Sequence, residues 1–452
     1  MVPMQRLFTP IATSALAMLL CSAETPAQDR PMEMPHAEAA RLHPRELYRD
    51  VQNEPLPEES ASTPVHVMGA PFNVVYGWFP YWTSASATAG MRADLLTHIA
   101  WFSIGVDTAT GALGSVDQWK STSAVTWAKG KGLKVHLTIT CFGSAELRAL
   151  LSSPNKRARC VADIVSALDL RQADGVNIDF ESLPASQRAN MVSFIQALRA
   201  ALPQKEITIA TPSVDWNSSW DYATLARIAD FLVVMGYDYY WSGSTTAGPV
   251  APLKGETYNL TRSIDAHLNA GVDPERLVAA VPLYGRTWTV STTARKASVV
   301  SGTSSATPTY SSAQNLVGMS SRLHDELTRV SWFNDASSGV IKQTWIDDSL
   351  SLDAKYRHIK SKGLRGVGFW ALGYDGGRSS MWQGLGAMAT TSSIAEDQGH
   401  DGIEQTDDGD VDLYTLLGQH VFHGPAHTLA QSPLPAGVYV RVSGRRSRLI
   451  IR

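Results

Sequence analysis

The amino-acid sequence predicts an α/β protein built around a (β/α)8 TIM barrel. Eight apolar, strand-like segments recur between about residue 71 and residue 389. Stretches with apolar residues at helical spacing lie between most of them. No glycine-rich phosphate-binding turn follows the first strand-like segment, which disfavours an open nucleotide-binding sheet. Alternating strands and helices in this number favour a closed parallel barrel.

The predicted strands are, in chain order, residues 72–79, 98–106, 133–140, 175–181, 206–214, 230–238, 276–285 and 365–373. The clearest helices are residues 159–173, 186–202 and 353–363. The connection after the seventh strand is too long for a simple loop. It contains residues 329–347, whose pattern predicts a hairpin around Asp335 to Gly339. We therefore expect a small α+β insertion at about residues 289–347.

Residues 1–27 have the features of an export signal peptide. Arg6 precedes an apolar run of about fourteen residues, and small residues follow. The run is too short to span a membrane, so we expect a secreted or cell-surface protein with no membrane span. Residues 28–70 are rich in Pro, Glu, Ala and Ser without a sustained period. They predict a linker or an N-terminal arm.

The chain changes character after the barrel. Residues 390–410 predict an acidic linker, which we favour over a calcium site, and residues 411–452 predict a small C-terminal β segment. With its Leu-Gly-Gln and Leu-Pro-Ala-Gly-Val-Tyr pattern, this segment resembles the sorting domain of type IX secretion cargo. The resemblance implies contact with secretion machinery; the alternative is a β appendage that binds sugar or packs on the barrel. His420, His423 and His427 lack an acid or cysteine to complete a metal site, so we expect no metal.

The composition gives no sign of binding to nucleic acid or to an anionic membrane. The formal net charge of -3 gives no reason to expect nucleic acid or an anionic membrane. Thirteen tryptophans are compatible with a sugar-binding cleft, although tryptophan also fills cores. Beyond the predicted signal peptide, Cys141 and Cys160 remain. Their pairing in a disulfide and their burial as two separate thiols are equally compatible with the sequence.

The segment DGVNIDFE, residues 174–181, concentrates polar groups in a predicted strand. Strand side chains alternate, so the apolar residues face the helices while Asn177, Asp179 and Glu181 point into the barrel. Burying carboxylates there costs free energy unless they are hydrogen-bonded or act in catalysis. Glu181 lies at the carboxyl end of the strand, where barrel active sites lie. A purely structural polar ladder is the alternative.

Four motifs in order along residues 71–389 resemble the family-18 glycoside hydrolases, the chitinase group. The segment DGVNIDFE is similar to the family pattern Asp-x-x-Asp-x-Asp-x-Glu on the fourth strand. The other three are MGYD at residues 235–238, VPLYGR at 281–286 and GVGFW at 366–370. The family's larger members also carry an α+β insertion after the seventh strand. The resemblance implies a retaining glycosidase that needs no cofactor.

The resemblance also implies roles for residues. Glu181 would be general acid and then general base, while the 2-acetamido oxygen of the sugar attacks the anomeric carbon. Asp179 would orient the acetamido group and raise the pKa of Glu181, and Tyr237 would bond the acetamido carbonyl. In addition to these three residues, we expect the following to bind substrate: Asn177, Met235, Asp238, Tyr284, Arg286, Trp370 and Tyr81.

Asn177 departs from the commoner family pattern, which has Asp at this position. We expect its amide to donate a hydrogen bond to Asp179. Ala371 also stands where chitinases often carry Glu. Further aromatic residues near strand ends could stack on successive sugars, and we expect about half of them to do so. Besides Tyr81 they are Trp78, Trp82, Trp216, Tyr240, Trp241 and Trp288.

The sequence therefore predicts an exported hydrolase of β-1,4-linked N-acetylglucosamine polymers, chitin or chito-oligosaccharides. One alternative keeps the mechanism but takes peptidoglycan or an N-glycan core as substrate. Another is a non-catalytic carbohydrate-binding protein on the same barrel; the presence of Glu181 argues against it.

Overall fold

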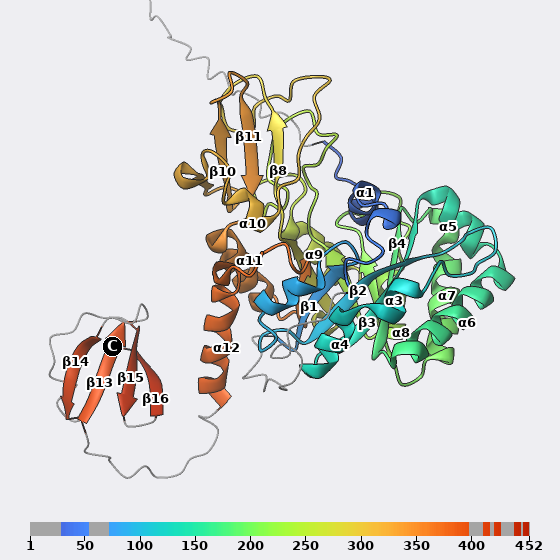
Figure 1. Cartoon of the computed structure of the whole chain (residues 1–452), viewed down its shortest axis with the longest axis horizontal. Helices are drawn as coiled ribbons and strands as arrows, with labels where there is room; N and C mark the ends of the chain where they lie inside the picture. Colours follow the sequence, from blue (N-terminus) through green and yellow to red (C-terminus); the bar gives the residue numbers. More distant parts are fainter. Residues whose placement is uncertain are drawn as a thin grey trace, which may run out of the picture.

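The computed structural model describes residues 29–53, 72–396, 410–415, 420–425, 438–443 and 446–451. Its centre is a closed parallel barrel with strand order β1-β12-β7-β6-β5-β4-β3-β2, which confirms the predicted fold class (Figure 1). The barrel strands are β1 (Val74–Pro80), β2 (His98–Gly105), β3 (Lys134–Phe142), β4 (Gly175–Glu181), β5 (Glu206–Thr211), β6 (Phe231–Met235), β7 (Leu277–Pro282) and β12 (Gly366–Trp370). Each of them falls on one of the predicted strands, with ends shifted by a few residues.

Helices surround the barrel, as the helical periodicity predicts (Figure 1). They are α3 (Asp117–Ser121), α4 (Ser123–Gly130), α5 (Ser144–Leu151), α6 (Pro154–Arg171), α7 (Arg188–Ala201), α8 (Tyr222–Ile228), α9 (Leu260–Asn269), α11 (Ser349–Ser361) and α12 (Gln383–Glu396). Helix α6 begins with residue types that are typical of a helix N-terminus. The Ser153 side chain accepts from the Lys156 amide, and Pro154 occupies the first helical position. Among the described helices, none is long and apolar enough to cross a membrane.

Strand β4 separates its two sets of side chains as its alternation predicts. On the outward side, Phe180 stacks on Phe194 of α7 with ring centroids 5.4 Å apart. The inward side carries Asn177, Asp179 and Glu181, all buried. The strand therefore contributes to both the core and the barrel interior.

The long connection after β7 forms a separate antiparallel sheet, with strand order β8-β11-β10-β9 (Figure 1). Its strands are β8 (Arg286–Thr289), β9 (Leu323–Asp325), β10 (Val330–Asp335) and β11 (Lys342–Ile346). Strands β10 and β11 are the predicted hairpin, with Asp335 opposite Lys342. The sheet begins at Arg286, slightly before the predicted start of the insertion, and α10 (Tyr310–Ala313) precedes β9. Trp288, Trp332 and Trp345 fill a core of its own.

The segment predicted as a linker or N-terminal arm contains α1 (Pro35–Leu42) and the short helix η1 (Arg45–Leu47). Helix α1 lies beside the barrel near β4 (Figure 1). Its contacts, described below, reach side chains of the barrel interior. The described part of this segment is thus packed against the barrel, which composition alone did not predict.

The end of the barrel and the C-terminal segment differ in one detail from expectation. Helix α12 continues to Glu396, so the acidic linker cannot begin at residue 390. The C-terminal segment forms an antiparallel sheet with strand order β14-β13-β15-β16. Its strands are β13 (Asp410–Thr415), β14 (His420–Pro425), β15 (Val438–Ser443) and β16 (Arg446–Ile451). The predicted signal peptide and most of the acidic linker lie outside the described residues.

Cys141 and Cys160 are free, buried thiols rather than a disulfide. Burial raises the pKa of both to about 12, so both remain protonated at neutral pH. The two cysteines therefore belong to the core.

Candidate active site

The residues named by the motifs converge at the carboxyl end of the barrel. Glu181 is the last residue of β4, and Trp370 is the last residue of β12. Tyr237 follows Met235, which ends β6 and is buried. Because parallel strands end at the same rim, residues far apart in the chain meet here. The structure brings Asp179, Glu181, Tyr237 and Trp370 together around a single group, the imidazole of His36.

Glu181 has the electrostatic environment of a general acid. Burial, and next the charge of Asp179, raise the pKa of Glu181 well above its usual range. Burial and the nearby carboxylates likewise raise the pKa of Tyr237, which stays a neutral hydroxyl donor. The site therefore brings two carboxyl groups and a phenol O–H into one small volume, and burial favours the protonated form of Glu181.

His36, the second residue of α1, occupies this volume and is fully buried. Its Nδ1 lies 2.7 Å from Oδ2 of Asp179, and its Nε2 lies 2.6 Å from the Tyr237 hydroxyl. A carboxylate only accepts, so Nδ1–H donates to Asp179, and in the neutral ring Nε2 then accepts from the Tyr237 O–H. The His36 backbone N–H donates to Oε1 of Glu181 at 3.0 Å. One residue thus contacts all three predicted catalytic side chains.

Aromatic rings enclose the same imidazole. It stacks on Trp370 with centroids 3.8 Å apart and an interplanar angle of 23°. Trp78 and Phe102 approach it edge-on at 4.9 and 5.5 Å. Trp370 therefore lies against one face of the imidazole, and a flat group fits between it and the β4 carboxylates.

Asn177 does not make the predicted hydrogen bond to Asp179. Its Nδ2 donates to Oγ1 of Thr208 at 3.0 Å, and its Oδ1 accepts from Nε1 of Trp78 at 2.9 Å. Asn177 pairs with Thr138 of β3, two positions before the pair formed by Asp179, so it lies deeper in the barrel. There the Trp78 N–H and the Thr208 hydroxyl use both ends of its amide. Among the described residues, Oδ1 of Asp179 has no hydrogen-bond partner.

Asp238, Tyr284 and Arg286 form the neighbouring wall. The Asp238 carboxylate lies 3.5 Å from Arg286, which also contacts Glu38 of α1 at 2.8 Å. Burial raises the pKa of Asp238 to about 6, although Arg286 acts in the opposite direction. The ring of Tyr284 packs edge-on against Tyr237 at 6.2 Å. These predicted substrate contacts therefore adjoin the predicted catalytic residues, and α1 contacts Arg286 through Glu38.

A cavity of about 160 Å³ remains between α1 and this wall. Asp238, Tyr284, Arg286 and Trp370 line it from the barrel, and Pro35, Glu38 and His43 line it from the N-terminal segment. Its position shows that the segment fills only part of the cleft around the predicted site.

The other predicted aromatic contacts divide into two groups. Tyr81 and Trp82 adjoin the site, where Tyr81 donates to the His43 carbonyl and Trp82 stacks on the His43 ring at 4.5 Å. Trp78 lies beside His36, while Trp216 and Trp241 contact Arg30. In contrast, Tyr240 and Trp288 belong to the core of the insertion and are buried there. These two cannot stack on sugars because side chains of the inserted sheet cover them.

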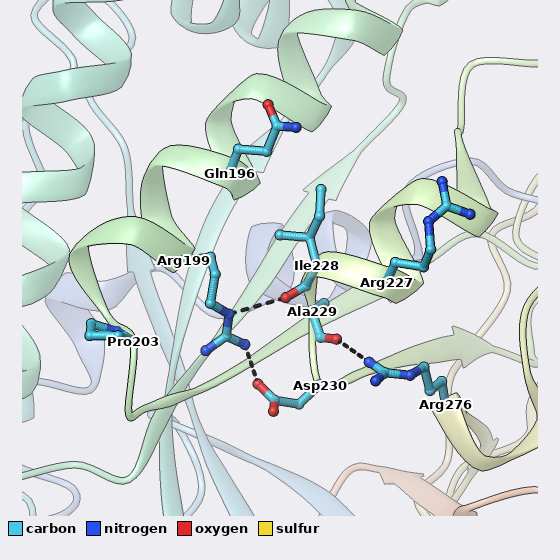
Figure 2. Close-up of a pocket in the computed structure, with 8 residues that line it drawn as sticks. All are labelled: Gln196, Arg199, Pro203, Arg227, Ile228, Ala229, Asp230 and Arg276. Carbon is cyan, nitrogen blue, oxygen red and sulfur yellow. Dashed lines mark hydrogen bonds and ion pairs between the residues drawn. The ribbon is translucent and has the colours of Figure 1, made fainter.

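A second pocket lies at the C-terminal ends of α7 and α8, and its polar side chains have a structural role (Figure 2). Arg199 donates to the Ile228 carbonyl and pairs with Asp230, and Arg276 donates to the Ala229 carbonyl. These arginines satisfy the carbonyl groups that a helix leaves free at its C-terminus. None of the motif residues lines this pocket.

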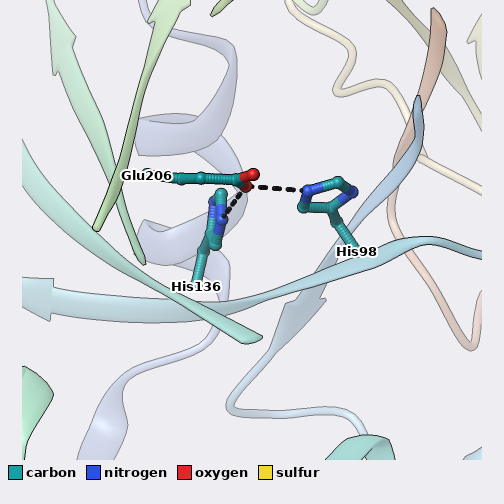
Figure 3. A group of neighbouring side chains, drawn as sticks. All are labelled: His98, His136 and Glu206. Atoms are coloured by element: carbon teal, nitrogen blue, oxygen red, sulfur yellow. Dashed lines mark hydrogen bonds and ion pairs between the residues drawn. The ribbon is translucent and has the colours of Figure 1, made fainter. Parts of the chain in front are cut away.

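Among the described residues, two groups could present three metal-binding atoms. One is the His36, Asp179 and Glu181 group already described. The other consists of His98, His136 and Glu206 (Figure 3). It lies where β2, β3 and β5 begin, at the opposite end of the barrel from Glu181. There His98 and His136 contact the same oxygen of Glu206 at 2.9 and 3.0 Å, and Lys134 pairs with its other oxygen. Burial lowers the pKa of His98 to about 4, so it is a neutral donor in an internal hydrogen-bond network.

Sequence reasoning missed His36. Pro followed by a run of Ala and Glu in residues 35–40 is a helix-start signal that could have located α1. Nothing local, however, indicates that the helix docks on side chains 143 and 201 residues further along.

Residues 76–375 match the family described as Glycosyl hydrolases family 18. Chitinase 1 of Aphanocladium album is 26% identical over 331 residues, 67% of this chain and 76% of that protein. The cortical fragment-lytic enzyme of Bacillus anthracis is 22% identical over 242 residues, 51% of this chain and 54% of that protein. The chain spans only 56%, 47% and 13% of the length of three further curated relatives.

Solved structures share the fold. A mutant of a family-18 chitinase from Cycas revoluta, in complex with (GlcNAc)4, has a TM-score of 0.61 at 21% identity. The match covers 71% of this chain and 99% of that one. Since the family match extends over well over half of the sequence, this chain belongs to family 18 of the glycosyl hydrolases.

Proposed function

We propose that the chain is an exported hydrolase of β-1,4-linked N-acetylglucosamine polymers, chitin or chito-oligosaccharides, that acts by substrate-assisted retention. The observation that carries the proposal is the group of Glu181, Asp179 and Tyr237 above the Trp370 ring. It provides one proton donor, one acceptor and one hydroxyl donor around a site for a flat polar group. An N-acetyl group needs an acceptor for its N–H and a donor for its carbonyl.

The proposed reaction has two steps. In the first, Glu181 gives its proton to the leaving glycosidic oxygen while the acetamido carbonyl oxygen bonds to the anomeric carbon. Asp179 accepts the acetamido N–H and stabilises the positive oxazolinium ion. In the second step, ionised Glu181 takes a proton from water, and the water oxygen bonds to the anomeric carbon. The bond from the anomeric carbon to the acetamido oxygen breaks, which opens the oxazolinium ring. The product retains the β configuration, and Glu181 is protonated again.

Export is part of the proposal and rests on the sequence. The apolar run in residues 1–27 supports a signal peptide. The C-terminal pattern and its small antiparallel sheet are compatible with a sorting segment that binds secretion machinery. Mass spectrometry of the N-terminus of the protein, recovered outside the cell, tests the signal. An N-terminus at residue 1 would contradict it.

A peptidoglycan substrate is the second candidate. The likeness to the cortical fragment-lytic enzyme supports it, because the name of that relative says that it lyses cortical fragments. The catalytic group suits both substrates, since both present an N-acetylglucosamine unit to the acid. Contacts further along the cleft therefore decide between them.

Product analysis on chitin oligomers, N-glycans and peptidoglycan in parallel tests the proposal. We expect chito-oligosaccharides to be cleaved fastest, with Glu181→Gln lowering kcat by at least about 1,000-fold, the upper part of the range for acid–base groups acting in two steps. Asp174→Asn, which removes an acid outside the catalytic group, is the control and should retain most of the activity. Equal kcat values for the Glu181→Gln and unaltered chains would contradict the assignment and favour a carbohydrate-binding protein.

A further inference from the structure

We propose that residues 29–53 are an intramolecular inhibitor of this active site, in which the His36 imidazole takes the place of the acetamido group of the substrate. The inference rests on the proposed function for the identity of the displaced ligand. The docking itself is seen in the structure, where a segment of the same chain fills the site.

The chemistry of His36 reproduces that of an N-acetyl group. A neutral imidazole presents one N–H donor and one nitrogen acceptor on a flat ring. The donor meets Asp179 and the acceptor meets Tyr237, and the ring lies on Trp370. An acetamido group has the same donor, acceptor and planarity. The same barrel side chains would therefore hold either group, and they cannot hold both at once.

The helix backbone also engages the catalytic acid. The amides of His36 and Ala37 donate to the two oxygens of Glu181 at 3.0 and 3.4 Å. They lie at the N-terminus of α1, where backbone N–H groups have no partner within the helix. The docked segment thus uses the carboxyl that would protonate the leaving group. No glycosidic oxygen can reach Glu181 while these bonds are made.

Contacts before α1 follow the cleft on one side. The Asp29 carboxylate accepts from the Thr245 amide and hydroxyl. The Arg30 guanidinium lies 4.4 Å from the centre of the Trp216 ring, and the Arg30 carbonyl accepts from Nε1 of Trp241. Trp216 and Trp241 are among the aromatic residues expected to stack on sugars. The segment therefore covers sugar-binding surface as well as the catalytic group.

Contacts after His36 continue across the other side. Glu38 makes two hydrogen bonds to Arg286, one of the predicted substrate contacts, at 2.8 and 3.3 Å. His43 stacks on Trp82, and the Arg45 guanidinium lies 4.1 Å from the centre of the Tyr81 ring. The segment thus makes charge-assisted, aromatic and backbone contacts with the cleft, which a random surface contact would not combine.

Gln52 anchors the end of the described segment away from the catalytic group. Its side chain is buried, donates to the carbonyls of Pro80 and Thr83, and accepts from Trp101 Nε1 and Thr122. This anchor shares no partner with His36. It keeps the inhibitory helix at a high local concentration, so the docked state competes with substrate at any enzyme concentration.

The test compares four full-length chains: unaltered, His36→Ala, His36→Ala/Glu38→Ala, and Arg41→Ala as control. Arg41 is exposed near the end of α1 and does not line the cavity between α1 and the barrel. Hydrolysis and isothermal titration use chitotriose as probe. Hydrogen exchange of the amides of residues 36 and 37 reports docking without any substrate.

We expect slow exchange at residues 36 and 37 in the unaltered and Arg41→Ala chains, and fast exchange in the double variant. The His36→Ala change should lower KM for chitotriose by at least about 10-fold with little change in kcat, because an intramolecular competitor raises only apparent KM. The double variant should lower KM further. Thermal unfolding of each chain confirms that the barrel remains folded.

The remaining outcomes separate the two proposals. Fast exchange in the unaltered chain, or the same KM and Kd for chitotriose in all four chains, would overturn the inhibitor. Tighter chitotriose binding in the double variant without hydrolysis would uphold the inhibitor and overturn the enzyme proposal. Binding by none of the chains would overturn both.

Discussion

At the scale of single residues, the free-energy cost of burying polar side chains in the site is offset by the hydrogen bonds that they make or by a change in their ionisation. Burial and the Asp179 charge both raise the pKa of Glu181 and so favour its protonated form. Asn177 is neutral and its amide is hydrogen-bonded at both ends, so it adds no charge beside Asp179. The position that departs from the commoner family pattern is therefore a structural link between Trp78 and Thr208.

We predict that Asn177→Asp lowers the free energy of unfolding by about 1–3 kcal/mol, more at pH 8 than at pH 5. The new carboxylate can accept from Trp78 and Thr208, but it adds a buried negative charge near Asp179. Burial raises its pKa, so the cost grows as pH rises and the group ionises. Urea unfolding at the two pH values measures the effect.

Asn217→Asp is the matched control, because Asn217 is exposed. It should change the free energy of unfolding by less than about 0.5 kcal/mol. Equal effects of the two substitutions, or a cost independent of pH, would show that position 177 tolerates charge.

At the scale of elements, the insertion is tied to the barrel through α11. Lys355 is fully buried in this helix, and its ammonium pairs with Asp347, just after β11. Burial raises the pKa of Asp347 to about 6, and Lys355 opposes the shift. The pair thus joins the end of the inserted sheet to the last barrel helix before β12.

We predict that Asp347→Asn lowers the free energy of unfolding by about 3 kcal/mol, because it leaves the Lys355 charge buried without its partner. The control is Asp353→Asn, which breaks the partly exposed pair with Arg357 on the same helix. Exposed pairs contribute less than about 1 kcal/mol. Urea unfolding near pH 8, where Asp347 is ionised, compares the two; similar losses would contradict the argument.

The elements also show where sequence reasoning succeeds. The β4 alternation and the hairpin at β10 and β11 follow from patterns within a few residues, and both could be predicted. The docking of α1 could not, because it depends on shape and charge complementarity to side chains more than 140 residues away. For Asn177, the sequence identified the position but not which of several neighbouring polar groups would bind its amide.

At the scale of the whole molecule, buried histidines make the fold sensitive to acid. Burial lowers the pKa of both His98 and His267 to about 4, whereas an unfolded histidine titrates near 6.5. Between these values the unfolded chain binds protons that the folded chain does not. Stability is therefore fully present above about pH 6.5 and is lost as pH falls toward 4.

We predict that the free energy of unfolding falls steadily between pH 7 and pH 4.5, by several kcal/mol at most for the two groups together. Urea unfolding at half-unit pH steps measures the slope. Hydrogen bonds from the histidines and Lys134 lower the pKa of Glu206 despite its burial, so its contribution is lost only at still lower pH. A flat stability profile over this range would contradict the assignment of His98 and His267 as neutral.

Under the proposed function, the β4 carboxylates cleave an acetamido sugar with retention at the anomeric carbon. Proton NMR of the first product formed from chitotetraose tests it most directly, with the His36→Ala chain and with His36→Ala/Glu181→Gln as control. Substrate-assisted retention predicts that the β-anomer appears first and equilibrates later. An initial α-anomer, or equal turnover by the Glu181→Gln control, would contradict the account.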